Sequence, residues 1–147
     1  MATKRDRTAF AVSNNLKTAM TAAGYIFPIQ PGQAFYDGAA NDRHLAHEQF
    51  DDGSFRTTNI IGTTVDFDFI VPGDPALARI WTERELQVFI GSIPGVGGSS
   101  GTLNADTWTW VIPFNGQNFS ANDTSKPDAI AKALIKVLQE PAARKAG

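Results

Sequence analysis

The sequence predicts an α+β fold, organised as a single small domain over residues 1–147 with short charged tails at 1–7 and 142–147. In this fold, three helices cover a largely antiparallel sheet of about four strands. Three observations predict it. The length of 147 residues suits one hydrophobic core. The 42% of hydrophobic and 19% of charged residues are typical of a globular protein. Helical periodicity near both ends encloses segments in which apolar and polar residues alternate.

The first helix is expected from about Arg7 to Ala23, because its apolar residues fall on one face at helical spacing. These residues are Ala9, Val12, Leu16, Ala19, Met20 and Ala23. Gly24 follows, and glycine enters the left-handed conformation of a helix end at low cost. Pro28, Pro31 and Gly32 then break the chain into short extended pieces.

The middle of the chain predicts a polar loop, a strand and a helix. Residues 39–54 are mostly polar and are expected to form a loop outside the regular elements. The stretch "TTVDFDFIV" alternates apolar with mostly polar residues, which is typical of a strand. A helix is expected from about Asp74 to Ile90, since Asp74 suits the N-cap, Pro75 the first turn and Gly91 the end. "ELQVFIG" alone also fits a strand.

The last third predicts a loop, a strand and a closing helix. Residues 91–105 are rich in glycine and serine, and "DTWTWVIPF" is a strand with Trp108, Trp110, Ile112 and Phe114 on one face. The final helix, 127–140, has an apolar stripe over 130–138 that we expect to be core. Ser125 and Asp128 have the spacing of a capping box, and Pro141 ends the helix.

Composition excludes several classes of function. The absence of cysteine removes disulfides, thiolate metal sites and cysteine nucleophiles. The N-terminus lacks the apolar stretch of a secretory signal, and no run reaches the ~18–20 apolar residues that span a bilayer. We therefore expect a soluble intracellular product. Five of the 13 basic residues lie at the two ends, and residues 8–143 hold 8 basic and 14 acidic residues. This body carries a net charge of −6 and repels a phosphate backbone.

The segment "NDRHLAHEQFDD", residues 41–52, contains both histidines. On a helix, His44 and His47 would share a face with Glu48 and Asp51 one turn further on, which suits zinc or iron. The His-Glu-x-x-His pattern is absent, however, and the segment has little apolar stripe. The alternative is a solvated loop or a subunit contact, and we prefer it.

Asp66 and Asp68 are two apart on the predicted strand and would project to the same face, where they could hold Mg²⁺. Such a site needs a third acidic group and a phosphate-binding loop, and the glycine loop matches no such pattern. The alternative, which we favour, is a polar sheet face or pairing with Arg56 or Arg79. His44, His47, Asp66 and Asp68 thus remain weak metal candidates, and we expect neither cofactor nor catalytic residue.

Nucleophilic catalysis and ligand stacking find little support in the sequence. There is no Gly-x-Ser-x-Gly nucleophile elbow. Trp108 and Trp110 could stack on bases or sugars, but such a stripe is more often core or interface, and we expect both to be core.

Protein–protein contact therefore becomes the preferred prediction. The 39–54 and 91–104 segments are long polar stretches of the kind that order themselves on neighbours. The candidate contact residues are Asp42, His44, His47, Asp51, Gly95, Val96, Gly97 and Ser99.

The layout resembles the small tail-completion, or tail-terminator, proteins of tailed bacteriophages. "NNLKTAMTAAGY" looks like their opening helix, "TTVDFDFIVPGDPALARIW" like a strand followed by a Pro-initiated helix, and "DTWTWVIPF" like a late strand. The helix 127–140 and the polar segment 39–54 depart from that layout.

The resemblance implies a non-enzymatic virion subunit, assembled in the host cytoplasm. It would form a ring, commonly hexameric, that joins the tail tube to the head-side connector. DNA would pass through without specific binding, and no membrane would be involved. Two alternatives remain: a metal-dependent enzyme that uses Asp66 and Asp68 for phosphoryl or glycosyl transfer, and a small-ligand binding module.

Overall fold

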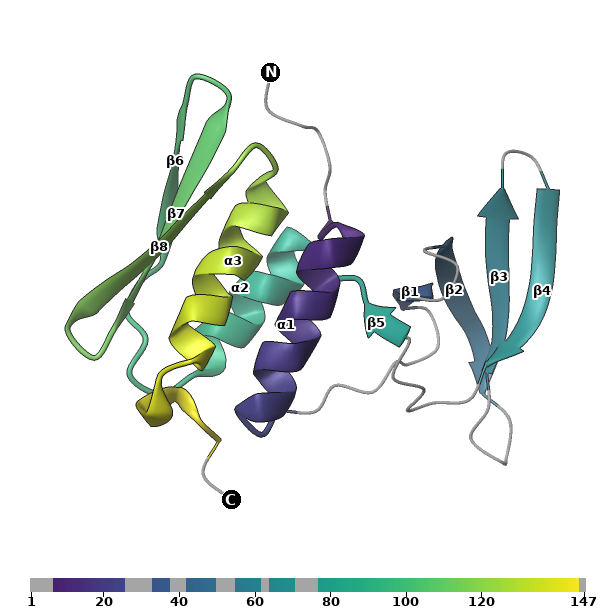
Figure 1. Cartoon of the computed structure of the whole chain (residues 1–147), viewed down its shortest axis with the longest axis horizontal. Helices are drawn as coiled ribbons and strands as arrows, with labels where there is room; N and C mark the ends of the chain where they lie inside the picture. Colours follow the sequence, from purple (N-terminus) through teal and green to yellow (C-terminus); the bar gives the residue numbers. More distant parts are fainter. Residues whose placement is uncertain are drawn as a thin grey trace. The chain divides into compact units, whose positions relative to one another are not determined.

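The computed structural model describes residues 7–25, 33–37, 42–49, 55–61, 64–70 and 77–145, with the backbone alone for 37, 42–49, 55–61, 64–70 and 77. The chain forms two compact units, which are coloured along the sequence in Figure 1. Unit 1 comprises Met1–Ile26 and Trp81–Gly147, and unit 2 comprises Phe27–Ile80. The α+β class and the antiparallel pairing are confirmed. The prediction of one domain concerns how the units combine and stays a prediction.

Unit 1 is built from three helices and a three-stranded antiparallel sheet. The helices are α1 (Phe10–Ala22), α2 (Glu83–Ser92) and α3 (Lys126–Leu138), and a short 3₁₀ turn, η1 (Pro141–Ala143), follows. The strands are β6 (Ser100–Asn104), β7 (Thr107–Phe114) and β8 (Gln117–Asp123), in the order β6-β7-β8. The expected first and last helices are therefore confirmed, as is the strand in "DTWTWVIPF".

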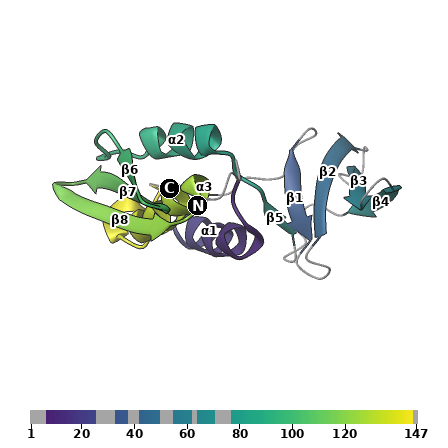
Figure 2. The same ribbon diagram turned by 90° about the horizontal axis from the view of Figure 1, so that it is seen from above.

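Helix α3 is the centre of unit 1. It packs against β7 and β8 on one side and against α1 and α2 on the other, as Figures 1 and 2 show. A helix that is covered on several sides is apolar around most of its circumference. Nine of its thirteen residues are buried, and Ile130, Leu134 and Val137 are fully so. The predicted stripe over 130–138 is thus confirmed as core.

The sheet of unit 1 is made by two tight hairpins. Asn115 and Gly116 both have positive φ, as a two-residue type I′ turn between β7 and β8 requires. Trp110, Ile112 and Phe114 are buried on alternate positions of β7, as predicted, and Trp108 is half-buried. Gly101 on β6 lies opposite Trp110, and a β-carbon there would collide with the indole ring. The second half of the predicted 91–105 loop is therefore a strand.

Helix α2 begins later than the sequence suggested. Thr82 is the N-cap: its side chain accepts the N–H of Glu85, and Glu85 Oε1 accepts the N–H of Thr82 at 3.0 Å. This capping box satisfies two backbone donors at the helix start. Leu77–Arg79 forms strand β5 instead of a helical turn, so the predicted helix from Asp74 is wrong over this stretch. Asp74 and Pro75 lie outside the described residues.

Unit 2 is a five-stranded antiparallel sheet in the order β4-β3-β2-β1-β5. Its strands are β1 (Ala34–Asp37), β2 (Asp42–Gln49), β3 (Phe55–Ile61), β4 (Thr64–Ile70) and β5 (Leu77–Arg79). The strand in "TTVDFDFIV" is confirmed as β4. The prediction of a polar loop over 39–54 is wrong for residues 42–49. These residues form a strand, because ladder bonds to β1 and β3 hold them extended. The described residues form eight strands in two sheets, more than the expected four or so.

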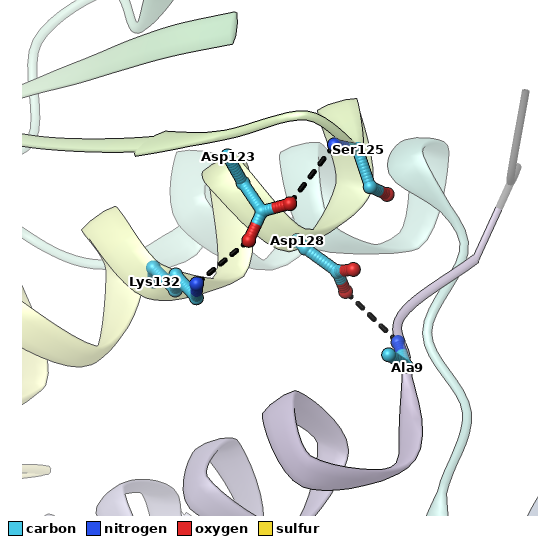
Figure 3. Close-up of polar contacts among 5 residues, drawn as sticks. All are labelled: Ala9, Asp123, Ser125, Asp128 and Lys132. Atoms are coloured by element: carbon cyan, nitrogen blue, oxygen red, sulfur yellow. Dashed lines mark hydrogen bonds and ion pairs between the residues drawn. The ribbon is translucent and has the colours of Figure 1, made fainter. Parts of the chain in front are cut away.

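Two buried or half-buried aspartates join α3 to its surroundings (Figure 3). Asp123 Oδ1 accepts the N–H of Ser125 at 2.9 Å, and Asp128 Oδ1 accepts the N–H of Ala9 at 2.8 Å. The predicted capping box between Ser125 and Asp128 is wrong, because Ser125 makes no side-chain cap and Asp128 is turned to α1.

The described parts of the predicted tails are attached to unit 1. Arg7 forms a β-bridge with Thr82, Tyr25 donates from its hydroxyl to the carbonyl of Ala143 at 3.1 Å, and Lys145 N–H donates to the carbonyl of Ala23 at 2.8 Å. Residues 142–145 are therefore attached to unit 1 by hydrogen bonds, with Ala143 buried and the other three exposed. Every helix in the described part of the chain is too short or too polar to cross a bilayer.

Candidate functional site

An open groove of about 840 Å³ runs along unit 1 between α1 and β8, and α3 forms its floor. Ala19 and Ala22 of α1 and Ile135 of α3 supply its apolar surface. Residues 120–122 of β8 form one wall, and Lys132 and Lys136 of α3 stand beside them. The groove therefore combines an apolar base, a strand edge and two ammonium groups.

The wall made by β8 is the edge of a sheet. Among the described residues, β8 is paired with β7 alone. In an antiparallel ladder every second residue directs its N–H and C=O away from the partner strand. Ser120 is such a residue, because its carbonyl accepts Lys136 Nζ at 2.6 Å instead of a β7 amide. Asn118, Ser120 and Asn122 are exposed along this edge.

Lys132 binds at the C-terminal end of the same strand, where its Nζ lies 2.6 Å from Asp123 Oδ2. Partial burial acts to raise the pKa of Asp123, but hydrogen bonds from Lys132 and from the backbone of Ser125 and Thr124 outweigh it. The pKa of Asp123 therefore lies below its ordinary value of 3.8. The carboxylate is ionised at neutral pH and keeps Lys132 beside the edge.

The two units carry opposite charge. Unit 1 contains ten basic and seven acidic residues, a net charge of +3. Unit 2 contains three basic and eight acidic residues, a net charge of −5. The sequence alone indicated an acidic body with basic tips. The basic residues of both termini instead belong to the unit that holds the lysine-flanked groove.

Asp66 and Asp68 lie on β4, which is an edge strand of unit 2 and is paired with β3 in the described part of the chain. In backbone register Asp66 is opposite Asn59, and Asp68 is opposite Thr57. Arg79 is on β5 at the other edge of this sheet, so it is not the neighbour of these aspartates that the sequence suggested. The side chains of β4 lie outside the described residues, and the magnesium site stays a prediction.

His44 and His47 lie on β2, so the helical face that a metal site would have used does not exist. His44 is opposite Phe35 and Asn59 in register, and His47 falls at an irregularity between Ala46 and Glu48. Within the described side chains, no three His, Cys, Asp or Glu residues are grouped as metal ligands would be.

The other predicted contact residues lie in different parts of the chain. Asp42 begins β2 and is paired with Asp37, while Asp51 lies outside the described residues. Gly95 accepts the N–H of Asn115 at 3.1 Å, Val96 forms a bridge with Phe114, and Gly97 donates to Pro113 at 2.8 Å. Gly95–Gly97 therefore runs along the end of β7, and Ser99 follows half-exposed just before β6. This segment is ordered by its own sheet, and its contact with a neighbour stays a prediction.

Trp108 and Trp110 both lie beside the ammonium group of Lys126, within unit 1. Lys126 Nζ lies 4.8 Å from the centre of the Trp108 ring and 5.7 Å from that of Trp110. It also lies 2.6 Å from Glu83 Oε1. Trp110 is core, as predicted, and the cation covers the pair, an arrangement that stabilises the sheet–helix contact.

The groove itself was not predicted. Its wall, β8, follows "NG" at 115–116, and Asn-Gly after an alternating segment is a strong hairpin signal. Lys132 and Lys136 are four apart, so they lie on one side of α3. Both signals were present, but neither indicates that a helix face and a sheet edge meet. No family model, curated protein or solved structure matches this chain.

Proposed function

We propose that this chain is a non-enzymatic structural subunit that assembles with copies of itself and with neighbouring proteins of a larger particle. The observation that carries the proposal is that, in the described part of the chain, each unit has a sheet whose edge strands are paired on one side alone, and the two units have opposite net charge. Unpaired strand edges are templates for pairing with another chain. Opposite charges on two different surfaces favour contact between unlike surfaces of successive copies.

Contact between unlike surfaces is heterologous, and it produces closed rings when the rotation between copies closes. A ring-forming tail terminator or head–tail junction protein of a tailed phage is the specific form that we propose. In this proposal, α1 corresponds to the opening helix of that layout and β7 to its late strand. The segment after β4 agrees less well, because α2 begins at Glu83 rather than at Pro75.

The test is the solution mass of the purified chain by light scattering, together with negative-stain images. We expect closed rings at micromolar concentration. A chain that remains monomeric at every concentration, in low salt and at physiological salt, would overturn the proposal. Stoichiometric metal in such a monomer, lost on Asp66→Ala with the fold intact, would instead favour the metal-dependent enzyme.

A further inference from the structure

We infer that the groove beside β8 of one copy receives the acidic edge strand β4 of a second copy, which adds to the three-stranded sheet as a fourth strand. This inference rests on the proposed function, since it names the surface through which the subunits join. The two strands match in length, because β4 and β8 have seven residues each. Strand addition of this kind uses main-chain hydrogen bonds for affinity and side chains for specificity.

The edge of β8 carries exposed residues at alternate positions and borders the groove. Asn118, Ser120 and Asn122 are exposed, and the groove of about 840 Å³ lies directly beside residues 120–122. Ser120 directs its carbonyl toward the groove, so its N–H points the same way and can pair with an added strand.

Lys136 decides which strand can add. Its ammonium group now occupies the Ser120 carbonyl that an incoming strand must use. Lysine at a sheet edge discourages indiscriminate pairing. An incoming strand with carboxylates offers the ammonium a stronger partner and so releases the carbonyl. Asp66 and Asp68 make β4 such a strand.

Charge also argues against the symmetric alternatives. Pairing β8 with β8 would bring the Lys132 and Lys136 pairs of two copies together. Pairing β4 with β4 would bring four aspartates together. Like charges facing each other across strands are destabilising. Pairing β4 with β8 joins the −5 unit of one copy to the +3 unit of the next.

The decisive experiment uses two full-length variants with one defective surface each. Lys136→Glu alters the groove, and Asp66→Lys with Asp68→Lys alters β4. Each variant alone should lose assembly, with at least a ~10-fold weaker association at low salt. An equimolar mixture should recover assembly, because the unaltered β4 fits the unaltered groove and the two reversed surfaces again carry opposite charges. Arg84→Glu, an equal charge change on the exposed side of α2, should leave assembly unchanged.

Amide hydrogen exchange of the wild-type chain gives an independent measurement that needs no variant. The Ser120 amide should exchange at least ~10-fold more slowly in the assembled state than in the dilute monomer. If wild-type rings form and both variants still form them, or the Ser120 amide is unprotected, this inference is wrong and the proposed function stands. If the wild type never assembles, the proposed function itself is wrong. Far-UV circular dichroism of each variant separates lost assembly from lost folding.

Discussion

Asp128 Oδ1 accepts the backbone N–H of Ala9 at 2.8 Å, which joins the first turn of α3 to the start of α1 across 119 positions of sequence. Helix α1 has no side-chain cap of its own at Ala9, and no acidic residue lies in its first turn. A carboxylate from another helix therefore accepts the N–H of the N-cap residue, as the N3 acid of a capping box does, at the end where the helix dipole favours negative charge. Figure 3 shows this contact beside the one between Asp123 and Lys132.

Replacing Asp128 should destabilise unit 1. Asp128 is 2% exposed and Ala9 is half-buried, so Asp128→Ala leaves the Ala9 N–H without this acceptor in a partly desolvated place. We expect a loss of about 1–3 kcal/mol in the free energy of unfolding, measured by urea denaturation. Asp128→Asn keeps an acceptor oxygen and should lose less. An Asp128→Ala variant as stable as the wild type would show that this contact does not hold the two helices.

Gly101 should not tolerate a side chain. A β-carbon at this position would collide with the indole ring of Trp110, which lies across β6. Gly101→Ala should cost about 1–3 kcal/mol of stability, the usual penalty of overpacking. Gly98→Ala is the matched control, because a β-carbon there meets nothing within 4 Å. Thermal melts of the two variants compare them directly, and equal melting temperatures would contradict the packing described here.

The turn between β6 and β7 should gain stability from glycine. Ala105 has φ 55°, a left-handed conformation that is strained for any residue with a β-carbon. Ala105→Gly should stabilise the chain by about 0.5–1 kcal/mol. Gly116→Ala tests the reverse, because Gly116 has φ 82° with open space around it, so its loss reports backbone strain alone. Chemical denaturation should shift in opposite directions for the two variants, and a shared direction would refute this.

The pair between Asp123 and Lys132 should make stability depend on acidic pH. The pKa of Asp123 is lowered in the folded chain, so its contribution is complete above the ordinary value of 3.8 and disappears as pH falls through the folded value. Lys132→Met should therefore cost more stability at about pH 6 than at about pH 2, where protonation weakens the pair. The loss should not exceed about 1 kcal/mol, because the Lys132 side chain is 45% exposed and solvent screens the pair.

Arg84→Met removes a cation from the exposed side of α2 and serves as the control for that titration. Its cost should stay constant between the two pH values. A cost of Lys132→Met that is equally constant would mean that the ion pair does not titrate with Asp123.

Periodicity predicted the elements whose burial is local and regular. The stripe of α3, the alternation of β7 and the alternation of β4 each appear in a short window of sequence, and all three are where they were expected. Residues 42–49 were wrongly predicted as a loop, because a polar strand shows little alternation of apolar with polar residues. Ladder bonds to β1 and β3 hold this strand in place. The start of α2 was misplaced because Asp74 and Pro75 mimic a helix start, whereas Thr82 and Glu85 make one.

The α+β class, the helix α3 and the alternating strands could be predicted from local pattern, because spacing along the chain reports which side chains face a core. The division into two units of opposite charge, and the groove that α1, α3 and β8 form beside two lysines, became visible in the folded chain. Those features arise where segments distant in sequence meet. Which strand lies at a sheet edge, and which charged residues lie beside it, depends on contacts between distant segments. No local pattern of sequence predicts these contacts.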